Sequence, residues 1–176
     1  DTPDGKIAVQ VTGQGGHLLW MMPEQAAFTA RYSQEECLQN AQVYLADVGF
    51  GQMEPCFVQQ YDGMVVANFA AVQDGVMLYP DQVKVQVSME TGRVVGAECS
   101  QYLSNHTPRT DVEPGITEKQ AGDMVSAKLT IRTRRLCVIP TEAGESLCWG
   151  FECAEGNDRY WAFISAETGE MEQLLR

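Results

Sequence analysis

The sequence lacks several features that would assign a function directly. It has no run of roughly 18–20 apolar residues, the length a membrane-spanning helix needs. No Cys-x-x-Cys occurs, and the two histidines, His17 and His106, lie far apart, so the spacing gives no zinc site. Glycine-rich phosphate-binding motifs and the Gly-x-Ser-x-Gly of hydrolases are also missing. We therefore expect no metal, no cofactor and no catalytic residues, and we predict that the chain is not an enzyme.

Basic residues are scarce as well. Lys and Arg number 12 against 24 Asp and Glu, which gives a formal net charge of −12. Nucleic acids and anionic membranes both attract Lys and Arg, so neither is an expected partner. The hydrophobic content of 44% over 176 residues is that of a globular protein with a real core. This length allows one large domain or two small ones.

A repeated pattern indicates how the chain is organised. Three strand-like segments end in a polar turn at Gly16, Gly92 and Gly169, which are 76 and 77 residues apart. Glycine suits a turn that needs a positive φ. Capping boxes at Ser33–Glu36 and Thr117–Gln120 open two predicted helices, and alternating strands separated by Asp-Gly turns follow the first of them. The order is one helix and then four or five antiparallel strands, twice, which predicts an α+β fold.

One predicted hairpin brings two cysteines together. If residues 140–145 form its loop, Ile139 lies opposite Ser146 and Cys137 lies opposite Cys148. Directly opposed Cβ atoms are close to disulfide geometry but usually somewhat too far apart. The pair is therefore either a cross-strand disulfide or, as we favour, two reduced neighbours. Arg134 would fall on the apolar face of this hairpin, so we expect a bulge or a register change nearby.

Two departures from the repeat mark a candidate binding surface. Trp161 and Phe163 stand where the preceding copy has Lys84 and Gln86, so the last copy is apolar on both strand faces. Either the chain covers the second face itself, which we favour, or that face meets a partner.

A group of basic residues is the second departure. Lys128, Arg132, Arg134 and Arg135 place four of the twelve basic residues within eight positions. They either pair with acidic groups of this chain or bind an anionic glycan or protein.

Longer strings carry a family resemblance. They are Gly15–Trp20 (GGHLLW), Asp74–Asp81 (DGVMLYPD) with Val83–Val87 (VKVQV), Tyr102–His106 (YLSNH) and Arg135–Glu142 (RLCVIPTE). With the helix-then-sheet order and the Glu-Thr-Gly turns, they resemble the PepSY domain, and more specifically the YpeB-type family of spore germination proteins. The resemblance covers nearly the whole chain.

The resemblance implies tandem PepSY units of cystatin-like fold, each with one helix on a four- to five-stranded antiparallel sheet. We predict a remnant C-terminal hairpin of a preceding unit at 1–27, a unit at 28–103, a linker at 104–115 and a unit at 116–176. The orphan hairpin is displaced, paired with another chain or added to the next sheet. Pairing with another chain would produce a homodimer.

The resemblance also implies a function. It indicates a non-catalytic protein-interaction module, exported to the spore envelope on the inner membrane or cortex side, with its N-terminal targeting segment absent from this chain. The implied partner is a SleB-type cortex-lytic enzyme, which the module retains, stabilises or restrains. Our candidate partner-binding residues are Trp161, Phe163, Arg132, Arg134 and Arg135.

The alternative is a cell-envelope domain that binds a peptidoglycan fragment or another small ligand. A pocket of convergent polar groups would favour this alternative, whereas a filled core would favour the interaction module.

Overall fold

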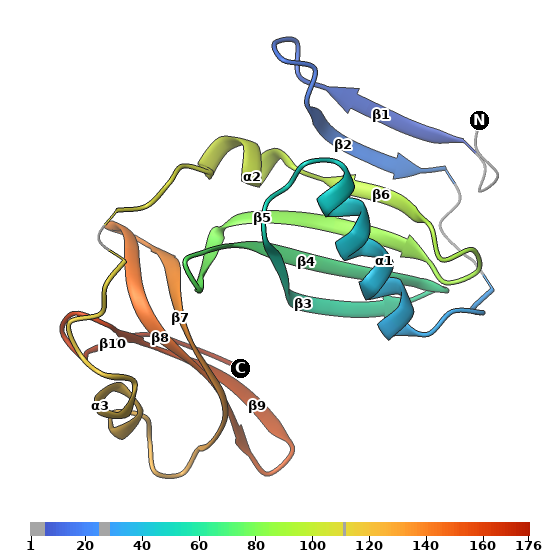
Figure 1. Cartoon of the computed structure of the whole chain (residues 1–176). Helices are drawn as coiled ribbons and strands as arrows, with labels where there is room; N and C mark the ends of the chain where they lie inside the picture. The colour runs from blue at the N-terminus through green and yellow to red at the C-terminus, as the bar shows by residue number, and fades with distance from the viewer. Residues whose placement is uncertain (1–5, 25–28, 111) are drawn as a thin grey trace. The chain divides into compact units, whose positions relative to one another are not determined.

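The chain folds as two compact units. The computed structural model describes residues 6–24, 29–110 and 112–176 (Figure 1). Unit 1 holds the described residues up to Val72 together with Pro80–His106, and unit 2 holds Gln73–Tyr79 and Thr107–Arg176. The structure is α+β and mostly sheet, which confirms the predicted fold class.

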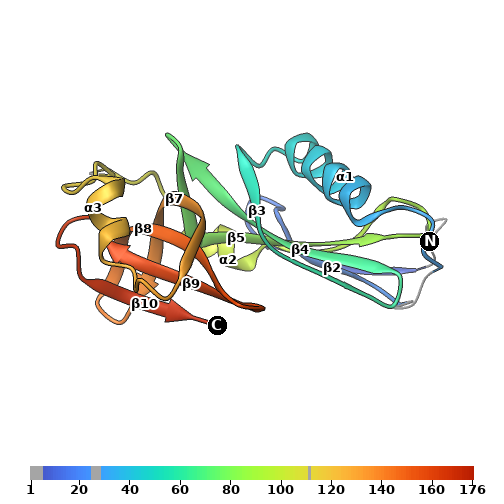
Figure 2. The same cartoon turned by 90° about the horizontal axis from the view of Figure 1, so that it is seen from below.

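Unit 1 is an antiparallel sheet with a helix along one face (Figure 2). Its strand order is β1-β2-β6-β5-β4-β3. The helix buries Cys37, Ala41 and Leu45, which recur at helical spacing. The elements are β1 (Ile7–Val11), β2 (Leu18–Pro23), α1 (Gln34–Asp47), β3 (Met53–Tyr61), β4 (Met64–Gln73), β5 (Val76–Ser88), β6 (Val94–Glu98) and α2 (Ser100–Asn105).

The N-terminal hairpin joins the sheet of unit 1. Trp20 and Met21 of β2 lie opposite Glu98 and Ala97 of β6, and the strands run antiparallel. The Cys99 amide extends the pairing by donating to the Leu19 carbonyl at 2.9 Å. Of the three alternatives for this hairpin, addition to the next sheet is the one that the structure contains.

Unit 2 contains a short helix and four antiparallel strands in the order β7-β8-β9-β10. Its core packs Ala121 and Val125 against the sheet residues Phe151, Cys153, Ala162 and Ile164. The elements are α3 (Glu118–Asp123), β7 (Thr130–Thr141), β8 (Gly144–Glu155), β9 (Asp158–Ser165) and β10 (Met171–Leu175).

A parallel pair corrects the prediction that every strand pair is antiparallel. Met77 and Leu78, at the start of β5, lie opposite Cys137 and Val138 of β7 in parallel register. The strand β5 is 13 residues long, and its first residues, up to Tyr79, belong to unit 2. This pairing joins segments far apart in sequence, so no local pattern announces it.

The two units repeat the same local hydrogen bonds. Both predicted capping boxes are present, at Ser33 for α1 and at Thr117 for α3. Gly92 and Gly169 both have positive φ, of 70° and 79°, which confirms why the repeated turn ends in glycine. Within the turn, the Gly92 amide donates to the Ser88 carbonyl at 2.8 Å, and the Gly169 amide donates to the Ser165 carbonyl at 3.0 Å. Ahead of each helix, the Tyr32 amide donates to the Met89 carbonyl at 2.8 Å, and the Ile116 amide donates to the Ala166 carbonyl at 2.9 Å.

Arg109 anchors part of the predicted linker 104–115 to unit 2. The Arg109 guanidinium donates to both carboxylate oxygens of Glu145, at 2.8 and 3.1 Å. The Gln73 side chain accepts from the Arg109 amide at 2.9 Å and donates to its carbonyl at 2.7 Å. This stretch is therefore held by specific contacts, while the predicted domain limits stay a prediction.

Candidate interaction surface

The sheet of unit 2 has two faces of different character. Side chains alternate along each strand, so residues directly opposed across the strands share a face. We call the face on which α3 packs the α3 face, and the opposite one the Trp161 face. Two rows of opposed residues cross the Trp161 face: Thr133, Glu152, Trp161 and Leu175, and then Arg135, Gly150, Phe163 and Gln173.

Trp161 and Phe163 lie on one face but differ in accessibility. Phe163 is 5% exposed and meets the Tyr79 ring edge-on, with ring centroids 5.8 Å apart. A Cβ on Gly150 would lie 3.3 Å from the Phe163 ring, so this glycine makes room for the ring. The structure corrects the prediction that Phe163 binds a partner, because the chain itself covers this side chain.

Trp161 remains at the surface. It is partly buried, and it lies between Glu152 and Leu175 in its row. Leu175 is 44% exposed, so the two side chains form a small apolar strip at the sheet edge. An aromatic ring beside an aliphatic side chain and near arginines has the composition of a protein-binding hot spot.

The predicted arginine group is divided between the two faces. Arg134 lies on the α3 face, where its guanidinium pairs with the Glu118 carboxylate at 2.9 Å. Its neighbour Arg135 lies on the Trp161 face and donates to the Met77 sulfur at 3.3 Å. Successive strand residues point to opposite faces, so this division follows from the strand itself.

Arg132 joins the Trp161 face through a bulge. The register of β7 and β8 shifts between Ile131 and Thr133, which confirms the irregularity that the sequence predicts near Arg134. Arg132 is exposed and shares a groove of about 390 Å³ with Glu152 and Arg159, among others. Within the part of the chain that the structure describes, the Arg132 guanidinium has no ion pair.

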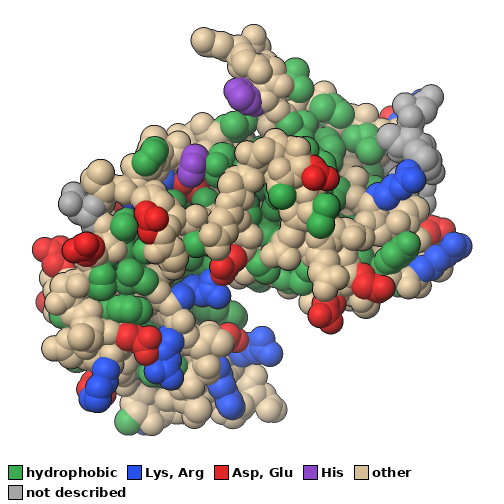
Figure 3. Space-filling view, in the orientation of Figure 1, with side chains coloured by type: hydrophobic (Ala, Val, Ile, Leu, Met, Phe, Trp, Pro, Cys, Tyr) green, Lys and Arg blue, Asp and Glu red, His purple; other side chains and the backbone are tan. Residues whose placement is uncertain are grey.

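Lys and Arg side chains are concentrated on unit 2. Figure 3 shows several of them close together over this unit, beside exposed apolar atoms. The structure thus brings Trp161, Arg132 and Arg135 together, buries Phe163 and turns Arg134 away.

The two cysteines of the predicted hairpin have the expected register, with Cys137 directly opposite Cys148. Both are buried free thiols in the structure. The Cys137 thiol approaches the Cys148 carbonyl at 3.5 Å, whereas the Cys148 thiol approaches the Ser146 hydroxyl at 3.6 Å. Burial raises the pKa of Cys137 to about 12, so this thiol stays protonated at neutral pH.

A histidine–carboxylate contact in unit 1 is a feature that sequence reasoning missed. His106 Nδ1 donates to the fully buried Asp81 carboxylate at 2.7 Å, and the His106 ring stacks on Tyr102. The Asn105 amide donates to the Pro80 carbonyl at 2.9 Å. Two of the strings that carry the resemblance, 74–81 and 102–106, therefore meet here and fasten α2 to β5. Their shared role in the resemblance was the only signal available in the sequence.

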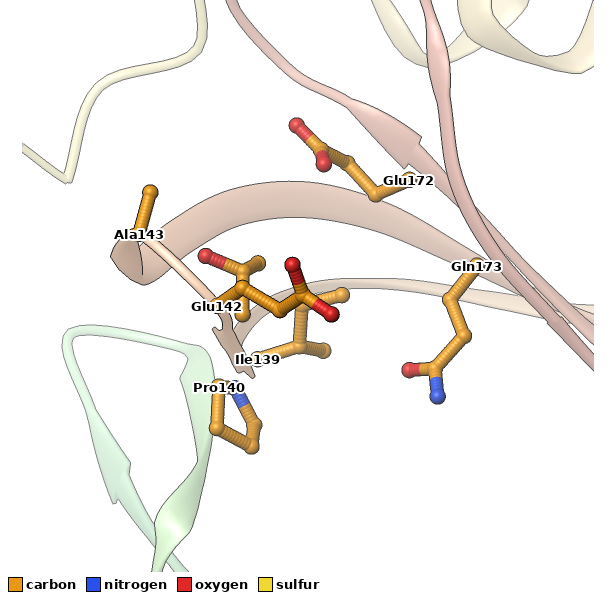
Figure 4. A pocket seen from close by; sticks show the side chains of 7 residues that line it. Ile139, Pro140, Glu142, Ala143, Glu172 and Gln173 are labelled. Carbon is orange, nitrogen blue, oxygen red and sulfur yellow. The ribbon is translucent and has the colours of Figure 1, made fainter.

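A surface hollow of about 670 Å³ lies between the β7–β8 turn and β10. Figure 4 shows Glu142 beside Ile139, with Glu172 and Gln173 of β10 across from them. The Glu172 carboxylate also accepts the Ser146 hydroxyl at 3.2 Å.

The described residues contain neither a metal-binding cluster nor a membrane-spanning helix. No group of three or more His, Cys, Asp or Glu side chains there is arranged to hold a metal ion. None of the described helices has the length and apolar character needed to cross a membrane.

Comparison with known proteins identifies the family. The family model described as YpeB sporulation, PepSY1 and PepSY2 domains, matches residues 1–112. This chain belongs to the YpeB family. The resemblance predicted from the sequence is thereby confirmed.

Similar proteins agree with this family. The Sporulation protein YpeB of Halalkalibacterium halodurans is 31% identical over 94% of this chain and 37% of its own length. The Bacillus subtilis protein of the same name is 29% identical over 98% of this chain and 39% of its own length. The Bacillus megaterium YpeB C-terminal domain is 30% identical, with a TM-score of 0.88 over 96% of this chain and 76% of that one. The chain spans about two-fifths of the curated relatives it matches.

Proposed function

We propose that this chain is a non-catalytic protein-interaction module of a YpeB-type protein that acts in sporulation and germination. It consists of tandem PepSY units of cystatin-like fold, at 28–103 and 116–176, with a remnant hairpin ahead of them. Its partner is a SleB-type cortex-lytic enzyme, which it retains, stabilises or restrains. The whole protein is exported to the spore envelope.

The observation that carries this proposal is the match to the YpeB family model over residues 1–112. The relatives of similar sequence are named sporulation proteins. A second support is the filled core between α3 and its sheet, where Ala121 and Val125 pack directly on Phe151. A filled core suits a module that binds through its surface better than one that encloses a ligand.

Co-purification of the lytic enzyme from spore extract with the full-length protein tests the proposal. Trp161→Ala removes the aromatic anchor of the Trp161 face, and hot-spot truncations typically cost about 2 kcal/mol or more, or roughly 30-fold in affinity. We expect this variant to retain little of the enzyme. Phe163 is left intact because truncating a buried phenylalanine costs about 3–5 kcal/mol of stability.

The matched control is Phe57→Ala, since Phe57 is 52% exposed on β3 of unit 1. This variant is expected to retain the enzyme at the level of the unchanged protein. Equal recovery with a folded Trp161→Ala variant would contradict a role for Trp161. No recovery by the unchanged protein would contradict the proposed partner itself.

Binding of a peptidoglycan fragment is the second candidate function, and the hollow beside Glu142 and Glu172 favours it. Its volume lies within the roughly 300–1,000 Å³ typical of small-ligand sites, and two carboxylates suit the ammonium groups of cell-wall peptides. Titration with soluble peptidoglycan fragments, followed by calorimetry, tests this function. We expect saturable binding that Glu172→Gln weakens about tenfold, the loss of one charge-assisted hydrogen bond. A flat titration would rule this candidate out.

A further inference from the structure

The Trp161 face carries positive charge in an acidic protein, and this contrast points to the chemistry of its partner. Arg132, Arg135 and Arg159 lie on or beside this face, and the carboxylates of Glu152 and Asp158 lie near them. The whole chain has a formal net charge of −12. A local excess of arginine on such a chain selects an anionic partner and steers its approach.

The two described carboxylates in this groove already have partners, since the Arg176 guanidinium donates to Asp158 at 2.9 Å. Glu152 accepts the Thr133 hydroxyl at 3.2 Å and lies 3.7 Å from the Arg159 guanidinium. Arg159 nevertheless keeps 74% of its side chain exposed, and Arg132 and Arg135 are exposed as well. The guanidinium groups of Arg132 and Arg159 are therefore accessible to a ligand.

The apolar part of the site lies next to these charges. Trp161 and Leu175 are directly opposed, and Arg135 is in the adjacent row of the same face. Phe163 and Gly150 are buried in that adjacent row, so the accessible part of the site consists of Trp161, Leu175 and the arginines beside them. The arginine guanidinium can donate two parallel hydrogen bonds to one carboxylate, so arginine binds acidic side chains with a more specific geometry than lysine does.

We propose that the Trp161 face binds an acidic, extended segment of a partner protein. An apolar side chain of this segment packs on Trp161 and Leu175, and its carboxylates bind Arg132, Arg135 and Arg159. A nucleic acid is disfavoured because the phosphate backbone requires a longer track of cations and would meet the acidic remainder of the chain. The inference rests on the proposed function and specifies the chemistry of the partner.

A synthetic peptide of alternating Glu and Leu, labelled with a fluorophore, tests this proposal by fluorescence anisotropy. The structure offers a matched pair of variants, since Arg135→Gln and Arg134→Gln remove the same charge from adjacent residues on opposite faces. We expect Arg135→Gln to weaken binding about tenfold and Arg134→Gln less than about twofold. Raising the salt concentration is expected to weaken binding to the unchanged protein, because exposed ion pairs are screened.

Three results would overturn the inference: no measurable binding, equal effects of the two variants, or equal binding of a peptide with Gln in place of Glu. Tighter binding of a double-stranded oligonucleotide than of the peptide would overturn the choice of partner. These results are separate from those for the proposed function. If the lytic enzyme co-purifies normally with Arg135→Gln, the proposed function stands and this inference fails. If the peptide binds as expected but no lytic enzyme is recovered, the proposed function alone fails.

Discussion

At the scale of single residues, the glycine of the repeated turn shows how one atom determines a local structure. Gly92 has a φ of 70°, and a Cβ there would lie 3.0 Å from the Asn40 amide nitrogen and 3.1 Å from the Tyr32 ring. The Asn40 amide also donates to the Gly92 carbonyl at 2.8 Å. Glycine thus serves both the turn and the close approach of α1 to it.

The buried thiols are expected to make the stability of the fold depend on pH in the alkaline range. Burial raises the pKa of Cys137 to about 12 and that of Cys99 to about 11, from an ordinary 9.0. In the unfolded chain these thiols ionise first, so the free energy of unfolding is highest below pH 9.0 and falls as the pH rises toward 11. Each thiol contributes at most about 1.4 kcal/mol per pH unit over this range.

Urea denaturation at a series of pH values checks this prediction. The free energy of unfolding of the Cys137→Ala variant is expected to fall less steeply with pH than that of the unchanged chain. Equal slopes would show that the raised pKa of Cys137 does not contribute to the pH dependence. Alkylation of the unfolded chain without reductant, followed by mass spectrometry, reports the redox state. A mass deficit of two alkyl groups would show one disulfide, and a cross-linked peptide containing Cys137 and Cys148 after proteolysis would assign it to this pair.

At the scale of secondary structure elements, the attachment of α2 to β5 depends on a few polar contacts. The Asp81 carboxylate is fully buried, and His106 reaches it from the end of the helix. A buried carboxylate that loses a hydrogen-bond donor retains the cost of its desolvation. We therefore expect His106→Ala to lower the free energy of unfolding by about 1–3 kcal/mol.

The chain provides its own control in its other histidine. His17 is exposed beside the turn of the N-terminal hairpin, so His17→Ala is expected to change stability by less than about 0.5 kcal/mol. Chemical denaturation monitored by circular dichroism measures both variants. Similar effects of the two substitutions would mean that the contact with Asp81 adds nothing to stability.

Elements whose signals are local were predictable from the sequence. The capping box of α1 at Ser33 requires only residues three positions apart, and the register of β7 and β8 depends on a short turn. The bulge near Arg132 followed from the conflict between alternation and the charge of Arg134. In contrast, the burial of Phe163 depends on Tyr79, more than eighty residues earlier. Of the predicted pair Trp161 and Phe163, only Trp161 is therefore accessible at the surface.

At the scale of the whole molecule, the net charge and the proposed acidic partner are connected through the Trp161 face of unit 2. The net charge of −12 disfavours polyanions as partners of the chain in general. The arginines of the Trp161 face are the local exception, and the proposed acidic segment depends on that exception.

The sequence by itself determined the family, the α+β class and the local elements, because periodicity, caps and turns act over a few residues. Only the tertiary structure decided that β2 pairs with β6, that β5 pairs in parallel with β7, and that Asp81 meets His106. The backbone edge of a strand offers the same donors and acceptors whatever its side chains, so sequence patterns do not specify its distant partner. Which faces are covered, and thus which residues can bind, follows from those pairings.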